Sequence, residues 1–140
     1  MPKPTPLQMQ PLPEWDLVLS AAARLQRILP GAVLVGGTAS AIHAHHRFSR
    51  NADHVLHAHH RFSRDADHVL TDLRVRFDAV LHQLESVAGW KTARVQRPVQ
   101  ILGSLDGIET GVRQLIREQP LETMVYEHAG EKLTVPTAAE

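Results

Sequence analysis

The 140-residue chain contains no cysteine. Disulfide bonds and thiolate metal sites are therefore excluded, which suits a protein of a reducing compartment. No apolar run approaches the roughly 20 residues needed to span a bilayer, and the N-terminus lacks the apolar core of a signal peptide. We therefore expect a cytoplasmic protein that does not enter a membrane.

The chain also lacks an excess of charge of either sign. Fifteen Lys and Arg residues balance fifteen Asp and Glu residues. This balance gives no indication of a nucleic-acid acceptor or of a membrane surface. The length fits one domain with a buried core.

A fourteen-residue segment occurs twice in tandem. The first copy, HAHHRFSRNADHVL (43–56), is followed by HAHHRFSRDADHVL (57–70), and the copies differ only at Asn51 and Asp65. Histidine pairs at helical spacing can bind Zn²⁺ or Ni²⁺. Duplication of the HAHH segment explains the large number of histidines equally well, and such residues are more often simply exposed to solvent.

The first half of the chain predicts an arm, a helix, a strand and a second helix. Residues 1–13 carry five prolines and little to bury, which predicts a flexible arm. Apolar residues at three- and four-residue spacing predict a helix from residue 14 to 28, which Pro30 and Gly31 end. The apolar run 32–37 predicts a buried strand with a glycine turn, and Thr38 is the expected N-cap of the next helix.

The second half predicts one helix and several strands. Asp72 is the expected cap of a helix that ends before Gly89. Short β-type runs follow at 92–95, 99–102, 108–115, 122–126 and 133–135, separated by Pro and Gly. We therefore expect an α/β (α+β) fold with a mixed sheet flanked by helices.

Two segments have residue types suited to phosphoryl chemistry. Gly36 and Gly37 precede a helix, whose free N–H groups and positive dipole end favour a phosphate. Asp65 and Asp67 lie at i and i+2, so on a strand both carboxylates project from one face and suit a hard cation such as Mg²⁺. Each signal alone is more often structural, as a tight turn or a solvated strand edge. Together they supply what phosphoryl transfer requires.

These residues resemble a known family. LVGGTASAIHAHHRFSR followed by DADHVLTDL is similar to the start of the nucleotidyltransferase fold, in the branch of abortive-infection (type IV toxin–antitoxin) nucleotidyltransferase toxins. The resemblance covers residues 14–140. It implies Gly36, Gly37 and Thr38 near the phosphates of an NTP, Asp65 and Asp67 as Mg²⁺ ligands, and Arg61 and Ser63 lining the same site.

The sequence departs from this family in three ways. Relatives have a third carboxylate on a later strand, for which Glu109 or Asp106 are the candidates. The chain corresponds to the family's core without its C-terminal helical region. Relatives place about a dozen residues between the second glycine and the first aspartate, whereas thirteen residues separate Gly37 from Asn51 and twenty-seven separate it from Asp65.

The repeat predicts a lengthened second helix. Fourteen residues make nearly four helical turns and add about 21 Å, so a helix from 38 to about 61 keeps its apolar stripe in phase. The few residues left before Asp65 could not then return to Gly36 and Gly37. This predicts a homodimer formed by segment exchange. The alternative is a monomer in which the repeat forms a surface loop.

Two functions follow from these observations. The first is a nucleotidyltransferase-like protein whose lineage transfers a nucleoside monophosphate from an NTP, with Mg²⁺ on Asp65 and Asp67 and with Glu109 as third carboxylate. Activity is expected to be impaired in this chain, because Asn51 is a poorer Mg²⁺ ligand than a carboxylate, the spacing to Asp65 is altered, and the C-terminal region of the family is missing. The alternative is a catalytically inactive scaffold that self-associates as an exchanged dimer.

Overall fold

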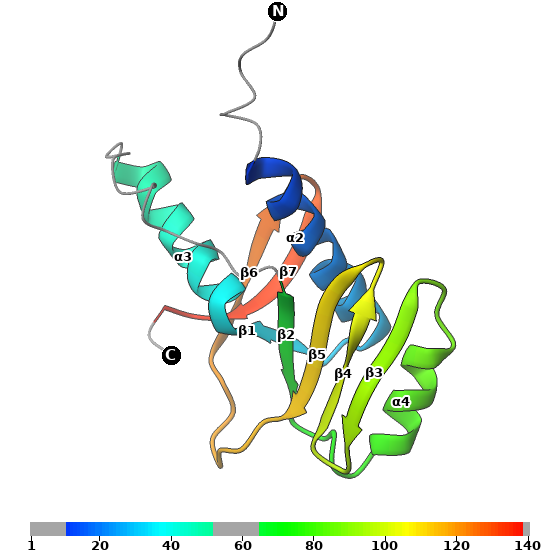
Figure 1. Cartoon of the computed structure of the whole chain (residues 1–140). Helices are drawn as coiled ribbons and strands as arrows, with labels where there is room; N and C mark the ends of the chain where they lie inside the picture. Colours follow the sequence, from blue (N-terminus) through cyan, green and yellow to red (C-terminus); the bar gives the residue numbers. More distant parts are fainter. Residues whose placement is uncertain (1–10, 52–64, 139–140) are drawn as a thin grey trace, which may run out of the picture.

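The computed structural model describes residues 11–51 and 65–138 of the chain (Figure 1). The described residues form three helices and seven strands. Helices α2 (Pro11–Ile28), α3 (Gly36–Asn51) and α4 (Phe77–Glu85) are joined by strands β1 (Val33–Val35) and β2 (Asp65–Leu70). The C-terminal half then consists of strands alone: β3 (Trp90–Gln96), β4 (Gln100–Leu105), β5 (Ile108–Gln114), β6 (Thr123–His128) and β7 (Glu131–Pro136).

Five strands form a mixed sheet in the order β1-β2-β5-β4-β3. Strands β2 and β5 are parallel, and the other neighbouring pairs are antiparallel. The register places Asp65 beside Glu109 and Asp67 between Val35 and Gly111. Strands β6 and β7 form a separate antiparallel hairpin, which lies at the β1 end of the sheet (Figure 1).

One face of the sheet carries the core. The side chains on this face pack against the buried apolar residues of α2 and α4. They include Leu34, Ala66, Leu70, Ile101, Leu105 and Val112. The alternate residues of the same strands project from the opposite face, which carries Asp65, Asp67 and Glu109. We call this second face the carboxylate face.

The predicted class, a mixed sheet flanked by helices, is confirmed. Several element boundaries differ from the prediction. Helix α2 begins at Pro11, within the segment expected to be a flexible arm, and residues 1–10 lie outside the described part. Helix α4 begins at Phe77, because turns occupy residues 71–76 and the Asp72 carboxylate accepts a bond from Arg76 Nε at 2.8 Å. It ends at Glu85, four residues before Gly89.

The predicted separation of Asp65 from the glycine turn is wrong. Strand β2 pairs with β1 of the same chain, so that Asp67 lies opposite Val35. Helix α3 is described as far as Asn51, and residues 52–64, on which the predicted continuation to 61 depends, lie outside the described part. The sixteen residues of α3 span about 24 Å. Thirteen further residues can span at most about 45 Å, which is enough to return to β1.

This geometry removes the argument for segment exchange. A single chain brings the glycine turn and the aspartates together, so no partner chain is needed to complete the sheet. The homodimer stays a prediction, which light scattering on the full chain at micromolar concentration would test.

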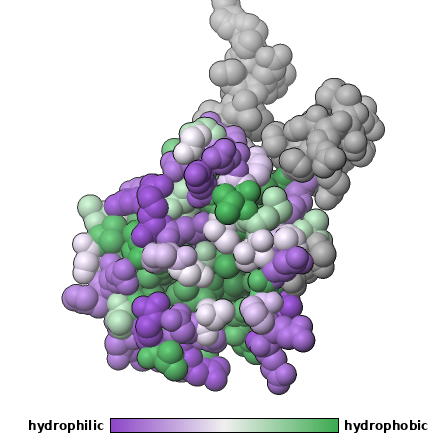
Figure 2. Space-filling view, turned by 180° about the vertical axis from the view of Figure 1, so that it is seen from behind, coloured by the Kyte–Doolittle hydropathy of each residue, from purple (hydrophilic) through white to green (hydrophobic). Residues whose placement is uncertain are grey.

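Exposed apolar side chains come from several different elements. The large ones in the described part are Leu17, Val75, Ile116, Met124 and Val125. On the side opposite to the view of Figure 1, apolar residues are interspersed with hydrophilic ones (Figure 2). No helix in residues 11–51 or 65–138 is both long and apolar enough to cross a membrane.

Candidate active site

The turn between β1 and α3 requires glycine at position 36. Gly36 has φ +80°, a conformation that other residues rarely adopt, and it starts α3 immediately after the last residue of β1. A Cβ at Gly36 would lie 3.5 Å from Asp67 Oδ2. This distance places the N-terminal end of α3 beside the Asp67 carboxylate. The first N–H groups of a helix have no carbonyl partner within it, and they carry the positive end of the helix dipole.

Three carboxylates share one face of the sheet. Asp65 and Asp67 alternate along β2, and Glu109 on β5 is the register partner of Asp65, about one strand spacing of 4.8 Å away. Asp65 and Asp67 are half-buried, whereas Glu109 is exposed. The structure therefore brings together the two predicted aspartates and one of the two candidates for the third carboxylate.

The pKa of the Asp67 carboxyl reflects the nearby negative charges. Burial raises the pKa of the Asp67 carboxyl above its usual value, and the neighbouring Asp65 carboxylate raises it further. The Arg113 guanidinium lowers the pKa of Asp67, and Glu109 adds a smaller increase. A bound cation would relieve the repulsion among the three carboxylates, so the residues present fit a divalent metal ion.

Asp106, the other candidate for the third carboxylate, has a structural role. It lies in the β4–β5 turn with φ +54°. Arg24 Nη1 of helix α2 lies 2.8 Å from both carboxylate oxygens of Asp106, and Arg24 Nη2 donates to the Ala88 carbonyl at 2.7 Å. Asp106 therefore ties the turn to α2 and is not one of the carboxylates that surround Asp67.

Thr38 lies inside the first turn of α3 and is not its N-cap, because the helix already begins at Gly36. Its side chain is buried, and Oγ1 donates to the Asp65 carbonyl at 2.7 Å. The hydroxyl therefore holds the start of β2 against α3. This positioning role was not visible in the sequence.

Replacement of Thr38 by Val is expected to lower stability and loosen the site together. The change removes a buried donor at constant shape and leaves the Asp65 carbonyl without it, which costs about 1–3 kcal/mol. Urea denaturation and Mg²⁺–NTP titration would measure the two effects. Thr38→Ser, which keeps the hydroxyl, should retain both properties, and equal loss in Thr38→Ser would contradict the positioning role.

Two of the residues implied by the family resemblance, Arg61 and Ser63, lie outside the described residues. Of the histidines in the repeat, His43 donates a hydrogen bond from Nε2 to the Pro136 carbonyl at 2.9 Å. Within residues 11–51 and 65–138, no group of three or more His, Cys, Asp and Glu side chains is close enough to form a ready metal site. Asp65 and Asp67 are thus the pair on which a metal site would be built.

Two glycines flank the Asp67 carboxylate, one on each side. Gly36 faces Oδ2, and a Cβ at Gly111 would lie 3.2 Å from Oδ1 and 2.9 Å from Leu102 Cδ2. Beyond Gly111 lies a cavity of about 220 Å³, whose lining includes Asp67, Gln100, Leu102 and Arg113. Gly111 and Arg113 were missed in the sequence, because only the pairing of β2 with β5 places them beside Asp67.

Replacement of Gly111 by Ala is expected to weaken Mg²⁺–NTP binding by about tenfold, or 1.4 kcal/mol. The added methyl group would crowd Asp67 Oδ1, while the end of the Leu102 side chain can move aside. Gly31→Ala is the matched control, since a Cβ at Gly31 meets only Leu70 Cδ2 at an ordinary 3.6 Å. Calorimetric titration measures the effect, and unchanged affinity in Gly111→Ala would show that this side of Asp67 is not used.

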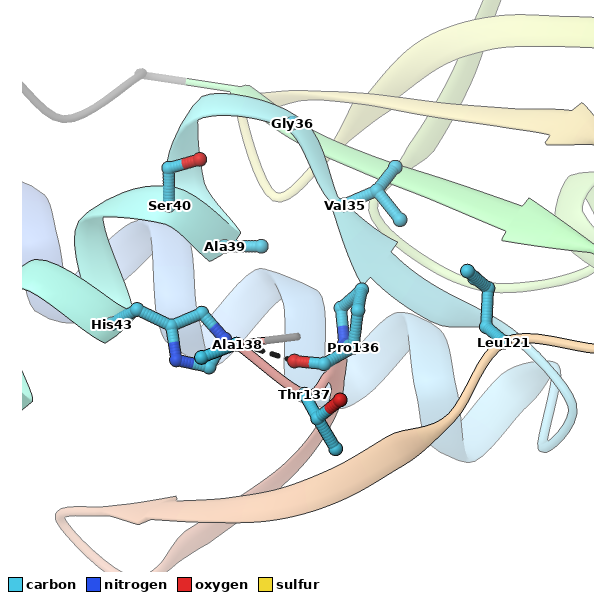
Figure 3. A pocket seen from close by; sticks show the side chains of 9 residues that line it. All are labelled: Val35, Gly36, Ala39, Ser40, His43, Leu121, Pro136, Thr137 and Ala138. Carbon is cyan, nitrogen blue, oxygen red and sulfur yellow. Dashed lines mark hydrogen bonds between the residues drawn. The ribbon is translucent and has the colours of Figure 1, made fainter. Parts of the chain in front are cut away.

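A larger pocket adjoins the glycine turn on its other side (Figure 3). It has a volume of about 430 Å³ and lies between α3 and the segment that follows β7. Its lining is formed by Val35, Gly36, Ala39, Ser40, His43, Leu121, Pro136, Thr137 and Ala138. Val35 is the register partner of Asp67, so the pocket and the carboxylates are neighbours across β1.

Comparison with solved structures identifies this architecture. A protein from Thermotoga maritima, proposed to be a nucleotidyltransferase, superposes with a TM-score of 0.51 at 16% sequence identity, over 91% of this chain and 80% of that chain. The chain has a nucleotidyltransferase-like fold. No protein-family profile matches the sequence, and a search of curated proteins gives no match. At this identity the likeness shows the fold alone, and the chemistry has to be argued from the site.

Proposed function

We propose that the chain is a nucleotidyltransferase-like protein that binds a Mg²⁺–NTP complex on the carboxylate face, next to the start of α3. Its lineage activity is transfer of a nucleoside monophosphate. The toxin branch indicated by the sequence resemblance belongs to this proposal.

The juxtaposition of Gly36 and Asp67 is the observation that carries the proposal. Phosphates favour a helix N-terminus, and Mg²⁺ favours carboxylates together with phosphate oxygens. In this chain the two groups are so close that a Cβ at Gly36 would lie 3.5 Å from Asp67 Oδ2. A triphosphate at the start of α3 therefore lies within reach of a cation held by Asp65 and Asp67.

Each site residue has a distinct role in the proposed transfer. Mg²⁺ on Asp65 and Asp67 would stabilise the charge that develops on the phosphates. The N–H groups of Gly36, Gly37 and Thr38 orient the triphosphate. An acceptor hydroxyl oxygen forms a bond to the α-phosphorus, the bond from that phosphorus to the bridging oxygen breaks, and pyrophosphate leaves. The hydroxyl proton passes to Glu109, the exposed carboxylate of the three.

The pocket of Figure 3 fits the nucleoside. Its volume of about 430 Å³ lies in the range of small-molecule pockets. Apolar side chains such as Val35 and Pro136 can pack against a base, while Ser40 and Thr137 offer hydroxyls to a sugar. Gly36 is shared with the phosphate turn, so one nucleotide can occupy both places.

The single difference between the repeats bears on activity. Asn51 lies at the family's spacing but is the last residue of α3, whereas Asp65 of the second copy occupies the site strand. The expectation that Asn51 removes a carboxylate therefore does not hold for this arrangement. We still propose that turnover is impaired, because the connection between α3 and β2 is longer than the family's spacing.

Calorimetric titration with each NTP, with and without Mg²⁺, tests the proposal. We expect binding that requires Mg²⁺ and that is lost in Ser40→Trp, where a large side chain fills the pocket from its exposed side. Glu127→Gln on β6, away from the pocket lining, is a control that should bind normally. Absence of binding for all four NTPs would refute the proposed function.

A further inference from the structure

Strand β6 forms one edge of the β6–β7 hairpin, and this edge is not paired with any of the described residues. The register between β6 and β7 has no shift, and the Thr137 N–H donates to the Glu122 carbonyl at 2.8 Å where the two strands meet the rest of the chain. In an antiparallel pair, the backbone groups of every second residue point at the partner strand. Thr123, Val125 and Glu127 therefore direct their N–H and C=O groups away from β7.

The other edge of the same hairpin is bonded. Gln26 of α2 donates from Nε2 to the Thr134 carbonyl at 2.9 Å, and its Oε1 accepts from the Thr134 N–H at 2.8 Å. Residues 123, 125 and 127, by contrast, form no hydrogen bond to another element within 11–51 or 65–138. Three donors and three acceptors thus lie in a row along β6, at the spacing that a further strand requires.

Edge strands that stay single usually have a feature that prevents pairing, such as a bulge, a proline or a lysine. Strand β3, an edge of the five-stranded sheet, has a register shift between Thr92 and Arg94 and contains Lys91. Strand β6, TMVYEH, contains no Lys, Arg or Pro. Its Met124 and Val125 side chains are 37% and 60% exposed. A regular edge with exposed apolar side chains indicates that another strand covers it.

We propose that β6 pairs with β6 of a second copy of this chain around a two-fold axis. The two hairpins then form one four-stranded antiparallel sheet, without exchange of segments. The outward-directed residues of one copy bond to those of the other, and an axis through Val125 is the register that pairs all three. Val125 then lies opposite Val125, and Thr123 lies opposite Glu127 of the second copy. This inference does not rest on nucleotide binding.

The side chains that this register brings together fit one another. On one face the two Val125 side chains meet at the axis, and the Thr123 hydroxyl lies opposite a carboxylate to which it can donate. On the other face Met124 lies opposite Tyr126, and a thioether packs favourably against an aromatic ring. The two Glu127 residues are about 13 Å apart, beyond the screening length at physiological salt. The register therefore covers both exposed apolar residues and places no like charges opposite each other.

Sedimentation equilibrium of the full chain tests this interface. A pair of six-residue strands is smaller than a standard interface, so we expect a reversible dimer with a micromolar Kd, measured from about 1 to about 300 µM. Val125→Lys and Val125→Glu should each stay monomeric, because like charges face each other across the axis. An equimolar mixture of the two variants should dimerise like wild type. Val75→Lys, at a side chain that is 81% exposed outside β6, is the matched control and should also dimerise.

Monomeric wild type up to about 300 µM would overturn the proposal. A Val125→Lys protein that dimerises like wild type, or a mixture of folded variants that stays monomeric, would overturn it as well. Hydrogen exchange of wild type provides a test without substitution. The amides of Thr123, Val125 and Glu127 should exchange more slowly at about 300 µM than at about 10 µM, and equal rates would contradict pairing along this edge.

Discussion

Replacement of Asp65 and Asp67 together by Asn is expected to abolish Mg²⁺-dependent NTP binding and to lower any transfer rate by at least about 100-fold. Asn keeps the shape of both side chains but removes the charges that a hard cation requires. Because repulsion within the carboxylate cluster also disappears, the double variant should be at least as stable as wild type. Calorimetry and urea denaturation would establish these two results.

Glu109 and Asp106 provide the contrast for that experiment. Glu109→Gln should weaken binding by about tenfold, less than loss of either aspartate, because Glu109 is exposed and lies at the margin of the site. Asp106→Asn should leave Mg²⁺–NTP affinity unchanged, since its carboxylate is held by Arg24. Equal binding by wild type and the double aspartate variant would rule out the metal role of Asp65 and Asp67.

Replacement of His68 by Leu is expected to protect the fold in acid. His68 is fully buried on the core face of β2; its Nδ1 lies 3.2 Å from the Ala66 carbonyl, and Nε2 has no partner among the described residues. Burial lowers the pKa of the imidazole from 6.5 to about 3, although the bond to Ala66 acts in the opposite direction. Between pH 6.5 and about 3, His68 is therefore protonated in the unfolded chain but stays neutral in the folded protein.

The direction of the pH effect follows from that difference. Because the pKa of His68 is lower in the folded state, its contribution to stability is complete above pH 6.5 and is lost progressively as the pH falls toward 3. The loss is on the order of 5 kcal/mol, comparable with the whole stability of a small domain. Protonation of Asp67 has the opposite effect on stability, because its pKa is raised in the folded state. Wild type and His68→Leu both contain Asp67, so this effect cancels in their comparison.

Acid unfolding followed by circular dichroism would measure this effect. His68→Leu should unfold at a clearly lower pH than wild type and should be no less stable at pH 7.5, where it removes an unpaired buried polar atom. His82→Leu, a change at an exposed histidine of α4, should unfold like wild type. Identical acid transitions for all three proteins would show that His68 does not control acid stability.

The sequence was sufficient to predict the local parts of the candidate site. Gly36 and Gly37 between an apolar run and a helix predict the turn, and the Asp-x-Asp pattern predicts two carboxylates on one strand face, because both are properties of neighbouring residues. The choice between Glu109 and Asp106 needed the parallel register of β2 with β5.

The errors in the fold have a common physical origin. The helical period of the repeat was taken to determine the path of the chain, and this made the aspartates seem unreachable from the glycine turn. Pairing of β2 with both β1 and β5 is instead satisfied within one chain, and the connection is long enough to allow it. Helix α4 similarly begins after the residue with the best capping side chain, because Asp72 bonds to Arg76 within a turn.

Anomalous diffraction from crystals soaked with Mn²⁺ and a non-hydrolysable NTP analogue would test the metal and nucleotide site most directly. We predict a manganese peak between the carboxylates of Asp65 and Asp67, with the triphosphate at the first N–H groups of α3 and the nucleoside in the pocket beside Ser40. A manganese peak away from both aspartates, or a nucleotide bound elsewhere on the chain, would contradict the account.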